Sequence, residues 1–270
     1  RFCPVTGVRR EDSEWVLTTP AGEIRCEYVV NAAGYRAAEL GRMFGRNVPC
    51  ISLAHQYLVT EAVPELTARD TQLPLLRDPD SSYYLRQEKD GLLLGPYEKN
   101  CRAHWTTPSD PMPADFSFQL YNDDLERLEW YIEDACARVP ILGTAGITRV
   151  VNGPIPYTPD GLPLLGKMPG VPNAFEACVF TFGIVQAGGA GKLLAEIIVE
   201  GESETDNWAV DPRRFTNHVD EAYTEAKAIE TYSHEYAMHF PQVQWPAARK
   251  AKVSPLYDRL AAAGAEFGAY

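Results

Sequence analysis

The chain has 270 residues, 45% of them apolar, and its 37 acidic and 25 basic side chains give a formal net charge of −12. This length allows one large domain or two smaller ones, and the apolar content excludes global disorder. The acidic balance argues against nucleic acid or an anionic membrane surface as the main partner, and no apolar run approaches a membrane span. We therefore expect no nucleic-acid partner and no membrane insertion.

The first third of the chain predicts short strands around one helix. Residues 1–34 have the pattern of a β-meander with a turn at Pro20 to Gly22, and they end in a short buried strand, EYVVNAAG. RAAELGRMFG has the pattern of a helix that Gly45 ends. The β-branched and aromatic stretch around His55, CISLAHQYLVTEAV, predicts the next strand.

The middle of the chain predicts a hairpin and a helix. Asp90-Gly91, between two apolar runs of residues 81–98, is the strongest short hairpin signal. Apolar residues then recur at helical spacing from Leu120 to Val139, and Pro140 ends this helix. Residues 147–166 predict a strand and a turn, and AFEACVFTFG predicts another strand.

The last part of the chain predicts mostly helices. AGGAGKLLAEIIVEG has the pattern of a glycine turn that feeds a helix, which stops at Gly201. From about Thr205 the composition changes: residues 221–240 are helical and polar, and residues 249–270 form a basic connector with a short helix. We find no internal repeat and no low-complexity tract.

The glycine-rich stretch at residues 182–198, FGIVQAGGAGKLLAEII, raises the question of a phosphate-binding loop. A Walker loop requires G-x-x-x-x-G-K-[ST], but Gln186 occupies the position of the first glycine and Leu193 that of the Ser/Thr. The dinucleotide pattern G-x-G-x-x-G fails as well. What remains is a glycine turn at a helix N-terminus, which either faces an electron-rich ligand or is a tight turn that binds nothing.

Two other stretches are also compatible with either a ligand site or a purely structural role. VVNAAG ends in small residues that let a cofactor approach or that simply allow helix-on-strand packing. NGPIPYTPDGLPLLG, residues 152–166, combines prolines with a turn signal and predicts either a ligand-lining loop or a structural one. In HEYAMH the histidines are five residues apart, whereas H-E-x-x-H needs four, so we reject a metal site.

The residues alone make His55 a catalytic candidate. Alternation places His55, Tyr57 and Val59 on one face of their strand, while the adjacent Tyr83 and Tyr84 face opposite ways. One of these two tyrosines is therefore a candidate to share a pocket with His55. Histidine and tyrosine can orient and deprotonate an amine, although a lone histidine is more often a hydrogen-bonded core residue.

Five stretches, taken in this order, resemble the dimethylglycine and sarcosine dehydrogenase family, FAD-dependent amine oxidoreductases of the D-amino-acid-oxidase superfamily. They are VVNAAGYRAAELG, HQYLVTEAVPEL, LPLLRDPDSSYYLRQEKDGLLLGPYE, VVNGPIPYTPDGLPLLG and GIVQAGGAGKLLAEIIVEGE. The last part, YAMHFPQVQWPAARKAKVSPLYDRLAAAGAEFG, resembles the central linker domain of that family. The resemblance covers nearly the whole chain.

The resemblance implies an α/β fold with an α+β substrate region. Residues 1–203 would form the C-terminal part of the FAD-dependent domain, with an antiparallel substrate-domain sheet, and residues 204–270 a small linker domain. The family's Rossmann unit, which holds the FAD pyrophosphate, and the histidine that attaches FAD have no counterpart in the sequence. We therefore expect a sequence truncated at both ends, with a complementing N-terminal chain as a candidate partner and tetrahydrofolate bound only on a following domain.

The resemblance also assigns residues to FAD. The helix opening near Gly188 would point at the isoalloxazine, where a helix N-terminus stabilises the negative charge of the reduced flavin. Residues 31–34 would approach the nucleotide half, and residues 153–161 would line the flavin. The implied cofactor-binding residues are Asn31, Ala32, Ala33, Gly34, Gly153, Pro154, Thr158, Pro159, Asp160, Gly161, Phe182, Gly183, Ile184, Val185, Gln186 and Gly188.

The implied reaction is oxidation of an N-methylated glycine-type amine, such as dimethylglycine or sarcosine, by hydride transfer to flavin. His55 matches the family's active-site histidine, and Tyr83 is the better match to its tyrosine, with Tyr84 as the alternative. His55 and Tyr83 would orient the amine and favour its neutral form, because an ammonium has no lone pair to expel hydride. Arg86, on the face of Tyr84, is the candidate for the substrate carboxylate.

Two other functions stay open from the sequence: another amine oxidase of the superfamily, similar to sarcosine oxidase, and a catalytically inactive module left by truncation. The stretch SPLYDRL favours the multidomain dehydrogenases. Six scattered cysteines without a C-x-x-C pair indicate a reducing compartment. We expect the cytoplasm for a bacterial source or the mitochondrial matrix for a eukaryotic one, a small methylated amine as partner, and an electron acceptor that the sequence does not identify.

Overall fold

The chain divides into two compact units, each assembled from two stretches that are far apart in the sequence. The computed structural model describes residues 2–99, 101–105 and 110–268. The first unit comprises residues 1–51 and 156–224, and the second comprises residues 52–155 and 225–270. No helix among the described residues is long and apolar enough to cross a membrane.

The first unit begins with the predicted β-meander. Strands β1 (Gly7–Glu11), β2 (Glu14–Thr19) and β3 (Gly22–Cys26) pair antiparallel in this order. Trp15 turns inward from β2 and is buried, and its ring packs edge-on against Phe44 with centroids 5.2 Å apart. The meander is thus attached to the rest of the unit by an apolar contact.

A second sheet of the first unit combines parallel and antiparallel pairing. Strand β12 (Ala174–Cys178) lies between β11 (Leu164–Lys167), its antiparallel neighbour, and β4 (Val29–Asn31), its parallel neighbour. Helices α1 (Ala37–Met43) and α4 (Gly183–Val199) belong to the same unit. The parallel pair with helical connections in the first unit and the antiparallel sheet in the second unit confirm the expected α/β and α+β fold class.

Helix α4 begins earlier than the sequence suggested. We expected a glycine turn and a helix that opens near Gly188, but Phe182 is the N-cap and the helix starts at Gly183. Gly188, Gly189 and Gly191 lie inside the helix. The predicted stop is correct, since Gly201 follows the helix in a left-handed conformation with φ of 88°.

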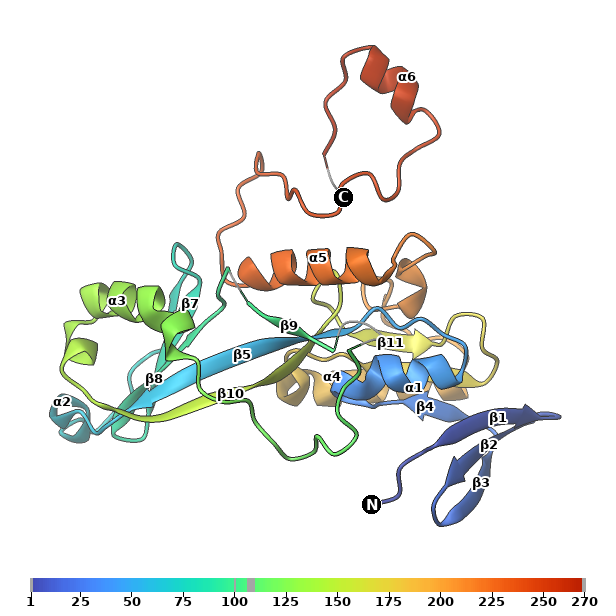
Figure 1. The fold of residues 1–270 in the computed structure, drawn as a ribbon, viewed down its shortest axis with the longest axis horizontal. Coiled ribbons are helices and arrows are strands. Elements are labelled where there is room, and N and C mark those ends of the chain that lie inside the picture. Colours follow the sequence, from blue (N-terminus) through green and yellow to red (C-terminus); the bar gives the residue numbers. More distant parts are fainter. Residues whose placement is uncertain (1, 100, 106–109, 269–270) are drawn as a thin grey trace. The chain divides into compact units, whose positions relative to one another are not determined.

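The second unit is built around a sheet in which β5 and β10 are the longest strands (Figure 1). Its strand order is β10-β5-β8-β7-β6, and β9 pairs with β5. The strands are β5 (Ile51–Thr60), β6 (Leu76–Asp78), β7 (Tyr83–Glu88), β8 (Gly91–Pro96), β9 (Ala103–His104) and β10 (Ile147–Tyr157). Strand β10 covers the first half of the stretch 152–166 that we expected to form a loop, so only residues 158–163 connect it to β11.

Helix α3 (Glu129–Arg138) packs on one face of this sheet. The remaining helical elements of the chain are α2 (Pro64–Thr67), α5 (Glu221–Ser233), α6 (Tyr257–Ala262) and the 3-10 turns η1 (Gly34–Arg36), η2 (Leu125–Leu128), η3 (Pro140–Gly143) and η4 (Pro212–Arg214). The buried core under α3 consists of Leu58, Val63, Leu66, Tyr83, Leu85, Leu92, Leu94, Leu128, Ala135 and Leu142. Helix α5 ends at Ser233, earlier than the predicted residue 240.

The predicted hairpin is present, but its turn is shifted by one residue. Glu88 pairs with Gly91, so the turn residues are Lys89 and Asp90, and Lys89 takes the left-handed conformation with φ of 55°. Gly91 is in the strand, where a Cβ would lie 2.7 Å from the carbonyl oxygen of Thr60. The glycine is therefore required by strand packing and not by the turn.

The helix predicted from Leu120 onward begins only with the 3-10 turn η2. Tertiary hydrogen bonds use the backbone before it: the Tyr121 N–H donates to the carbonyl of Asn152, and the Gln56 side chain bonds both backbone groups of Asp124. These bonds compete with the i to i−4 ladder of a helix. Leu120 is accordingly 60% exposed, outside any helix.

Candidate functional site

His55 lies on β5, and two tyrosines of the second unit enclose its imidazole. The ring of Tyr97 is 4.8 Å from the His55 ring, and the ring of Tyr232, on α5, is 5.8 Å away. His55 Nδ1 and the Tyr232 hydroxyl oxygen are 2.8 Å apart and share a hydrogen bond. Burial, followed by the positive charge of Arg127, lowers the pKa of His55 to about 4. The imidazole is therefore neutral at physiological pH.

A buried carboxylate continues this chain of hydrogen bonds. Glu98 is 1% exposed, accepts a hydrogen bond from the Tyr232 hydroxyl at Oε2, and has Oε1 3.0 Å from Nη2 of Arg127. Burial raises the pKa of Glu98, while the Tyr232 hydrogen bond and the Arg127 charge oppose this rise. We call His55, Tyr232, Glu98 and Arg127 the His55 network.

The structure places Tyr84, and not Tyr83, with His55. Tyr83 is fully buried in the core under α3, on the opposite face of β7. The Tyr84 ring is 6.5 Å from that of Tyr97, which itself packs on His55. The sequence favoured Tyr83 over Tyr84 as the active-site tyrosine, whereas the geometry favours Tyr84. Burial raises the pKa of Tyr84 to about 12, so its hydroxyl is a hydrogen-bond donor at neutral pH.

Arg77 and Arg86 lie near Tyr84, and in the part of the chain that the structure describes only one of them pairs its charge with a carboxylate. Arg86 forms an ion pair with Glu88, two residues away on the same strand. Arg77 is directly opposite Tyr84 in the pairing of β6 with β7, and its guanidinium lies 4.3 Å from the centre of the Tyr236 ring. Arg77 Nη2 also donates to the backbone carbonyl of Glu235 at 3.1 Å, while none of the ion pairs found among the described residues involves Arg77. Its charge is therefore better placed for an external carboxylate than that of Arg86.

We expect a pH titration to give His55 a pKa near 4, below the ordinary 6.5. Between these two values the unfolded chain binds a proton at this site and the folded protein does not, so this group's contribution to stability decreases as the pH falls through that window. The titration of ¹⁵N-histidine-labelled protein by NMR, with His55→Gln to assign the signal, measures this pKa directly. An ordinary pKa for His55 would contradict the enclosure described above.

In the first unit, the turn after β4 is held by Asn31. This residue is fully buried; its Nδ2 donates to the carbonyl of Ala37 at 3.0 Å, and its Oδ1 accepts from the N–H of Ala33 at 3.3 Å. The Asn31 side chain therefore fixes the turn from inside. Ala32 is exposed and Gly34 has φ of 57°, so the outer surface of the turn consists of small residues and backbone.

The connection from β10 to β11 is made rigid by Asp160. Thr158 Oγ1 donates to Asp160 Oδ1 at 2.9 Å, and Arg214 Nε donates to Oδ2 at 2.7 Å. Arg214 also donates to the carbonyl of Leu162 at 2.8 Å, and Gly161 has φ of 74°. The carboxylate of Asp160 is thus used within the protein, and this loop can offer a ligand its backbone and its shape.

Gly153 and Pro154 are in strand β10, within the second unit, and not in a loop. A Cβ at Gly153 would lie 3.0 Å from Cδ2 of Leu120. This contact alone accounts for the glycine. We keep both residues as proposed flavin neighbours, although nothing in their geometry requires a ligand.

The N-terminus of α4 has the properties expected at a cofactor. The first turn carries no acidic side chain, the N-cap Phe182 makes no side-chain cap, and the first helical hydrogen bond joins Gln186 N–H to Phe182. The N–H groups before it are therefore free of helical partners. Ile184 and Val185 are 95% and 82% exposed, and Gln186 Oε1 is buried without a hydrogen-bond partner among the described residues.

The glycines inside α4 support the same conclusion. Each glycine in a helix interior costs about 1 kcal/mol relative to alanine. A Cβ at Gly188, Gly189 or Gly191 would meet no atom within 4 Å. The described residues therefore give no reason for glycine at three positions of one helix. A group that packs closely on this helix supplies a reason, so the residues present fit the expected cofactor.

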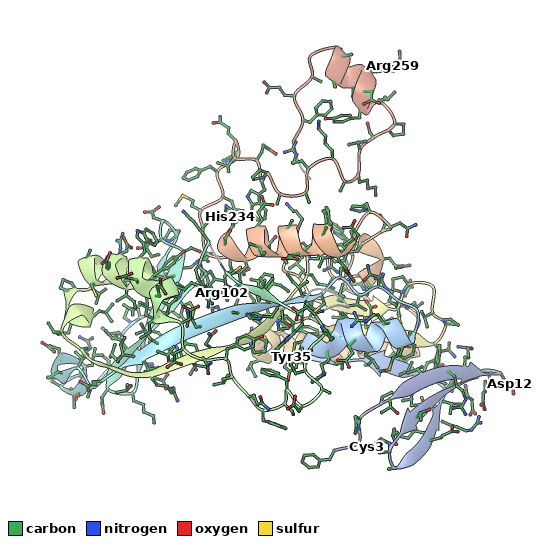
Figure 2. All side chains as sticks on the ribbon, viewed as in Figure 1. Cys3, Asp12, Tyr35, Arg102, His234 and Arg259 are labelled. Carbon is green, nitrogen blue, oxygen red and sulfur yellow. The ribbon has the colours of Figure 1, made fainter. Side chains whose placement is uncertain are left out.

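Sequence reasoning missed Tyr232, Arg127, Glu98 and Arg77. Glu98 carried a usable signal, because a carboxylate directly follows the fully buried strand β8 and Tyr97. Tyr232 carried none, since it is 177 residues from its partner His55. His234, labelled at the end of α5 in Figure 2, stacks on Trp245 with ring centroids 4.8 Å apart. Within the described part of the chain, no group of three or more His, Cys, Asp or Glu side chains is arranged to hold a metal ion.

Comparison with known families gives two matches along the chain. Residues 1–197 match the family described as FAD dependent oxidoreductase, and residues 200–254 match the FAD dependent oxidoreductase central domain. The chain therefore belongs to the family of FAD-dependent oxidoreductases. The expectation of FAD as the cofactor of this family is confirmed.

Two curated relatives show which members of this family the chain is similar to. The chain is 43% identical to mitochondrial dimethylglycine dehydrogenase of Mus musculus over 95% of its own length and 30% of that protein. It is 35% identical to mitochondrial sarcosine dehydrogenase of Mus musculus over 98% of its length and 29% of that protein. The resemblance inferred from the sequence motifs is confirmed, and the chain spans less than a third of these relatives.

A solved structure supports the fold. The crystal structure of L-proline dehydrogenase from P. horikoshii superimposes with a TM-score of 0.63 at 23% identity, over 80% of this chain and 54% of that one. At this identity the likeness concerns the fold alone.

Proposed function

We propose that this chain is part of an enzyme that uses FAD to oxidise an N-methylated glycine-type amine, such as dimethylglycine or sarcosine. One observation supports the proposal: His55 is a neutral histidine enclosed by tyrosine rings, in a chain of the FAD-dependent oxidoreductase family. FAD, when bound, supplies a two-electron acceptor for the hydride of the substrate carbon.

The chain's own residues would bind and orient the amine. The substrate nitrogen must be uncharged to release hydride, and burial away from water disfavours the charged ammonium. Because the pKa of His55 is about 4, this residue is too weak a base to take the proton of an ammonium at neutral pH. His55 would therefore accept a hydrogen bond, and Tyr84 would donate one to the substrate.

The residues proposed to lie against FAD are those around the N-terminus of α4, the small residues after β4 and the loop that Asp160 fixes. Their support is the free first turn of α4 and its glycine-lined side. We also propose that residues 1–203 and 204–270 are the two family modules. Cell fractionation would test the proposed location, which is the mitochondrial matrix for a eukaryotic source and the cytoplasm for a bacterial one.

The test is anaerobic reduction of the bound flavin in the full-length protein. We expect flavin absorption that stays with the protein through gel filtration and that bleaches on addition of dimethylglycine or sarcosine. Bound flavin that is bleached only by unmethylated amino acids would support another amine oxidase of the superfamily. Protein without bound flavin, even after incubation with FAD, would support a non-catalytic module.

Arg77 is proposed to bind the substrate carboxylate in place of Arg86. We expect Arg77→Gln to raise the KM for the amino acid substrate about tenfold or more, the effect of losing one charge-assisted hydrogen bond. Arg86→Gln is the matched control, because Glu88 already pairs with that arginine, and its KM should change less than about twofold. Steady-state kinetics decide, and a larger effect of Arg86→Gln would restore the original assignment.

A further inference from the structure

The His55 network determines where one proton lies. The Tyr232 hydroxyl has a single hydrogen, which it donates to Oε2 of Glu98. Its oxygen is then the acceptor in the 2.8 Å hydrogen bond with His55, so Nδ1 of the imidazole must carry the donating hydrogen. In a neutral imidazole this leaves the lone pair on Nε2.

We propose that Glu98 and Tyr232 are positioning residues that hold His55 as the neutral tautomer protonated at Nδ1, which makes Nε2 the hydrogen-bond acceptor for substrate. The hydrogen bonds found among the described residues use Nδ1 of His55 and leave Nε2 without a partner. The role of Nε2 toward substrate rests on the proposed function, whereas the tautomer itself does not.

The charge of Glu98 decides between the two tautomers. An ionised Glu98 can only accept, so Tyr232 donates to it and His55 donates to Tyr232. A protonated Glu98 would donate to the Tyr232 oxygen, Tyr232 would then donate to Nδ1, and the imidazole hydrogen would move to Nε2. The active-site face of His55 would change from acceptor to donor without any movement of heavy atoms.

Arg127 favours the ionised form of Glu98 and opposes the effect of burial, which raises the pKa of this carboxyl group. Its Nη2 lies 3.0 Å from Oε1, and the pair is almost inaccessible, with 7% and 1% of the two side chains exposed. Asp124 also acts on Glu98, and its negative charge opposes ionisation. The remaining ionisable neighbours are the thiol of Cys101 and the hydroxyls of Tyr84, Tyr97 and Tyr131, whose pKa values burial raises, so that they are neutral near pH 7. A close guanidinium and a hydroxyl donor, one on each oxygen, favour the carboxylate.

The network also joins separate parts of the sequence. Tyr232 comes from the stretch that matches the central domain, while His55 and Glu98 come from the stretch that matches the oxidoreductase domain. All of them belong to the same compact unit. The central domain therefore supplies a side chain that fixes the protonation of the oxidoreductase domain's histidine, which gives it a task beyond linking two domains.

NMR of the ¹⁵N-histidine-labelled full-length protein near neutral pH tests the tautomer without substrate. Long-range ¹H–¹⁵N spectra distinguish a protonated from an unprotonated ring nitrogen, and His55→Gln assigns the signals. We expect the Nδ1-protonated form of His55 to dominate about tenfold, as one net hydrogen bond provides. In Tyr232→Phe the ratio of the Nδ1-protonated to the Nε2-protonated form should fall to about one or below, because the acceptor for the Nδ1 hydrogen is lost.

Two further variants separate this proposal from a general packing effect. Glu98→Gln can donate through its amide and should shift His55 toward the Nε2-protonated form, the opposite of the wild type. Tyr131→Phe is the control, because it removes another buried hydroxyl of the same unit, one that accepts from the Lys99 N–H at 2.9 Å. We expect this control to leave the His55 tautomer unchanged. A wild-type His55 protonated at Nε2, or a tautomer that Tyr232→Phe does not alter, overturns the proposal.

Kinetics on the same variants separate the tautomer from the proposed function. In Tyr232→Phe we expect flavin reduction by the amine to slow about tenfold, as loss of one hydrogen-bond acceptor predicts, with a changed pH profile. If no N-methylated amine reduces the flavin but the tautomer pattern is as expected, the proposed function fails and the positioning role stands. If the amine reduces the flavin and His55 is protonated at Nε2, the positioning role alone fails.

Discussion

Replacement of Arg127 by methionine is expected to destabilise the second unit by about 3–5 kcal/mol near neutral pH. Methionine keeps the apolar stem of arginine but leaves Glu98, which is 1% exposed, as an uncompensated buried carboxylate. The free energy of opening, from native-state hydrogen exchange of peptides that cover β5 and β8, measures the loss in this unit alone.

The pH dependence of this loss identifies its cause. Without Arg127, the pKa of Glu98 rises further above its unfolded value, so the folded protein holds a proton more tightly than the unfolded chain. The destabilisation should therefore be small at a pH below the unfolded pKa of the carboxyl group and should increase as the pH rises. The double variant Arg127→Met with Glu98→Gln should recover part of the stability. A loss that is independent of pH would indicate lost packing and not an unpaired charge.

An exposed ion pair in the same unit provides the control. Arg86 pairs with Glu88 while 41% of the Arg86 side chain is accessible. Arg86→Met should change the free energy of opening by less than about 1 kcal/mol, since water screens such pairs. Equal changes in the free energy of opening for Arg127→Met and Arg86→Met would mean that the buried Arg127–Glu98 pair stabilises the unit no more than the exposed Arg86–Glu88 pair.

Elements with a local signal were predicted well from the sequence. The meander β1–β3 and the strands β5 and β12 lie where the short-range pattern placed them, because alternation and turn residues act within a few positions. The hairpin of β7 and β8 is also correct, although its turn is shifted. Gly91 is required by its close approach to the carbonyl of Thr60 on another strand. A contact between distant residues leaves no trace in the local sequence pattern.

The start of α4 shows why local glycine signals mislead. Three glycines before a lysine favour a turn, yet they continue a helix that packs against β11 and buries Ile197. Tertiary packing overrides the helix propensity of glycine, which costs about 1 kcal/mol per residue. The three glycines face open space among the described residues, so packing within the protein does not explain them. The glycines that led to a wrong helix start therefore support the proposal that a cofactor packs on this helix.

The candidate site was predictable only in part. The family motifs identified His55 and a tyrosine pair, but alternation cannot tell which of two neighbouring residues faces the core. That choice depends on α3, whose side chains pack on the face of β7 that contains Tyr83. The partners of His55 depend on a contact across 177 residues, which is set by the fold of the whole unit.

The second large effect that we expect is on catalysis at His55. His55→Leu should slow reduction of the bound flavin by N-methylated amine about a hundredfold, since a hydrogen bond to a group that develops charge contributes about 1.5–3 kcal/mol. His55→Gln places an amide group near the position of Nε2 and should recover part of the rate if acceptance of a hydrogen bond is the role of this residue. Rapid-mixing measurements under anaerobic conditions give the rate constants.

The two tyrosines test the same geometry with a matched pair. Tyr84→Phe should slow the reduction about tenfold, because it removes a hydroxyl on the face of Tyr97 and His55. Tyr83→Phe removes a hydroxyl from the opposite face and should leave the rate within about twofold, with any effect appearing in stability. Since the residues are adjacent and differ in the face of β7 they occupy, the ratio of their effects reports which face meets the substrate. A larger effect of Tyr83→Phe would place the substrate on the other face and separate it from His55.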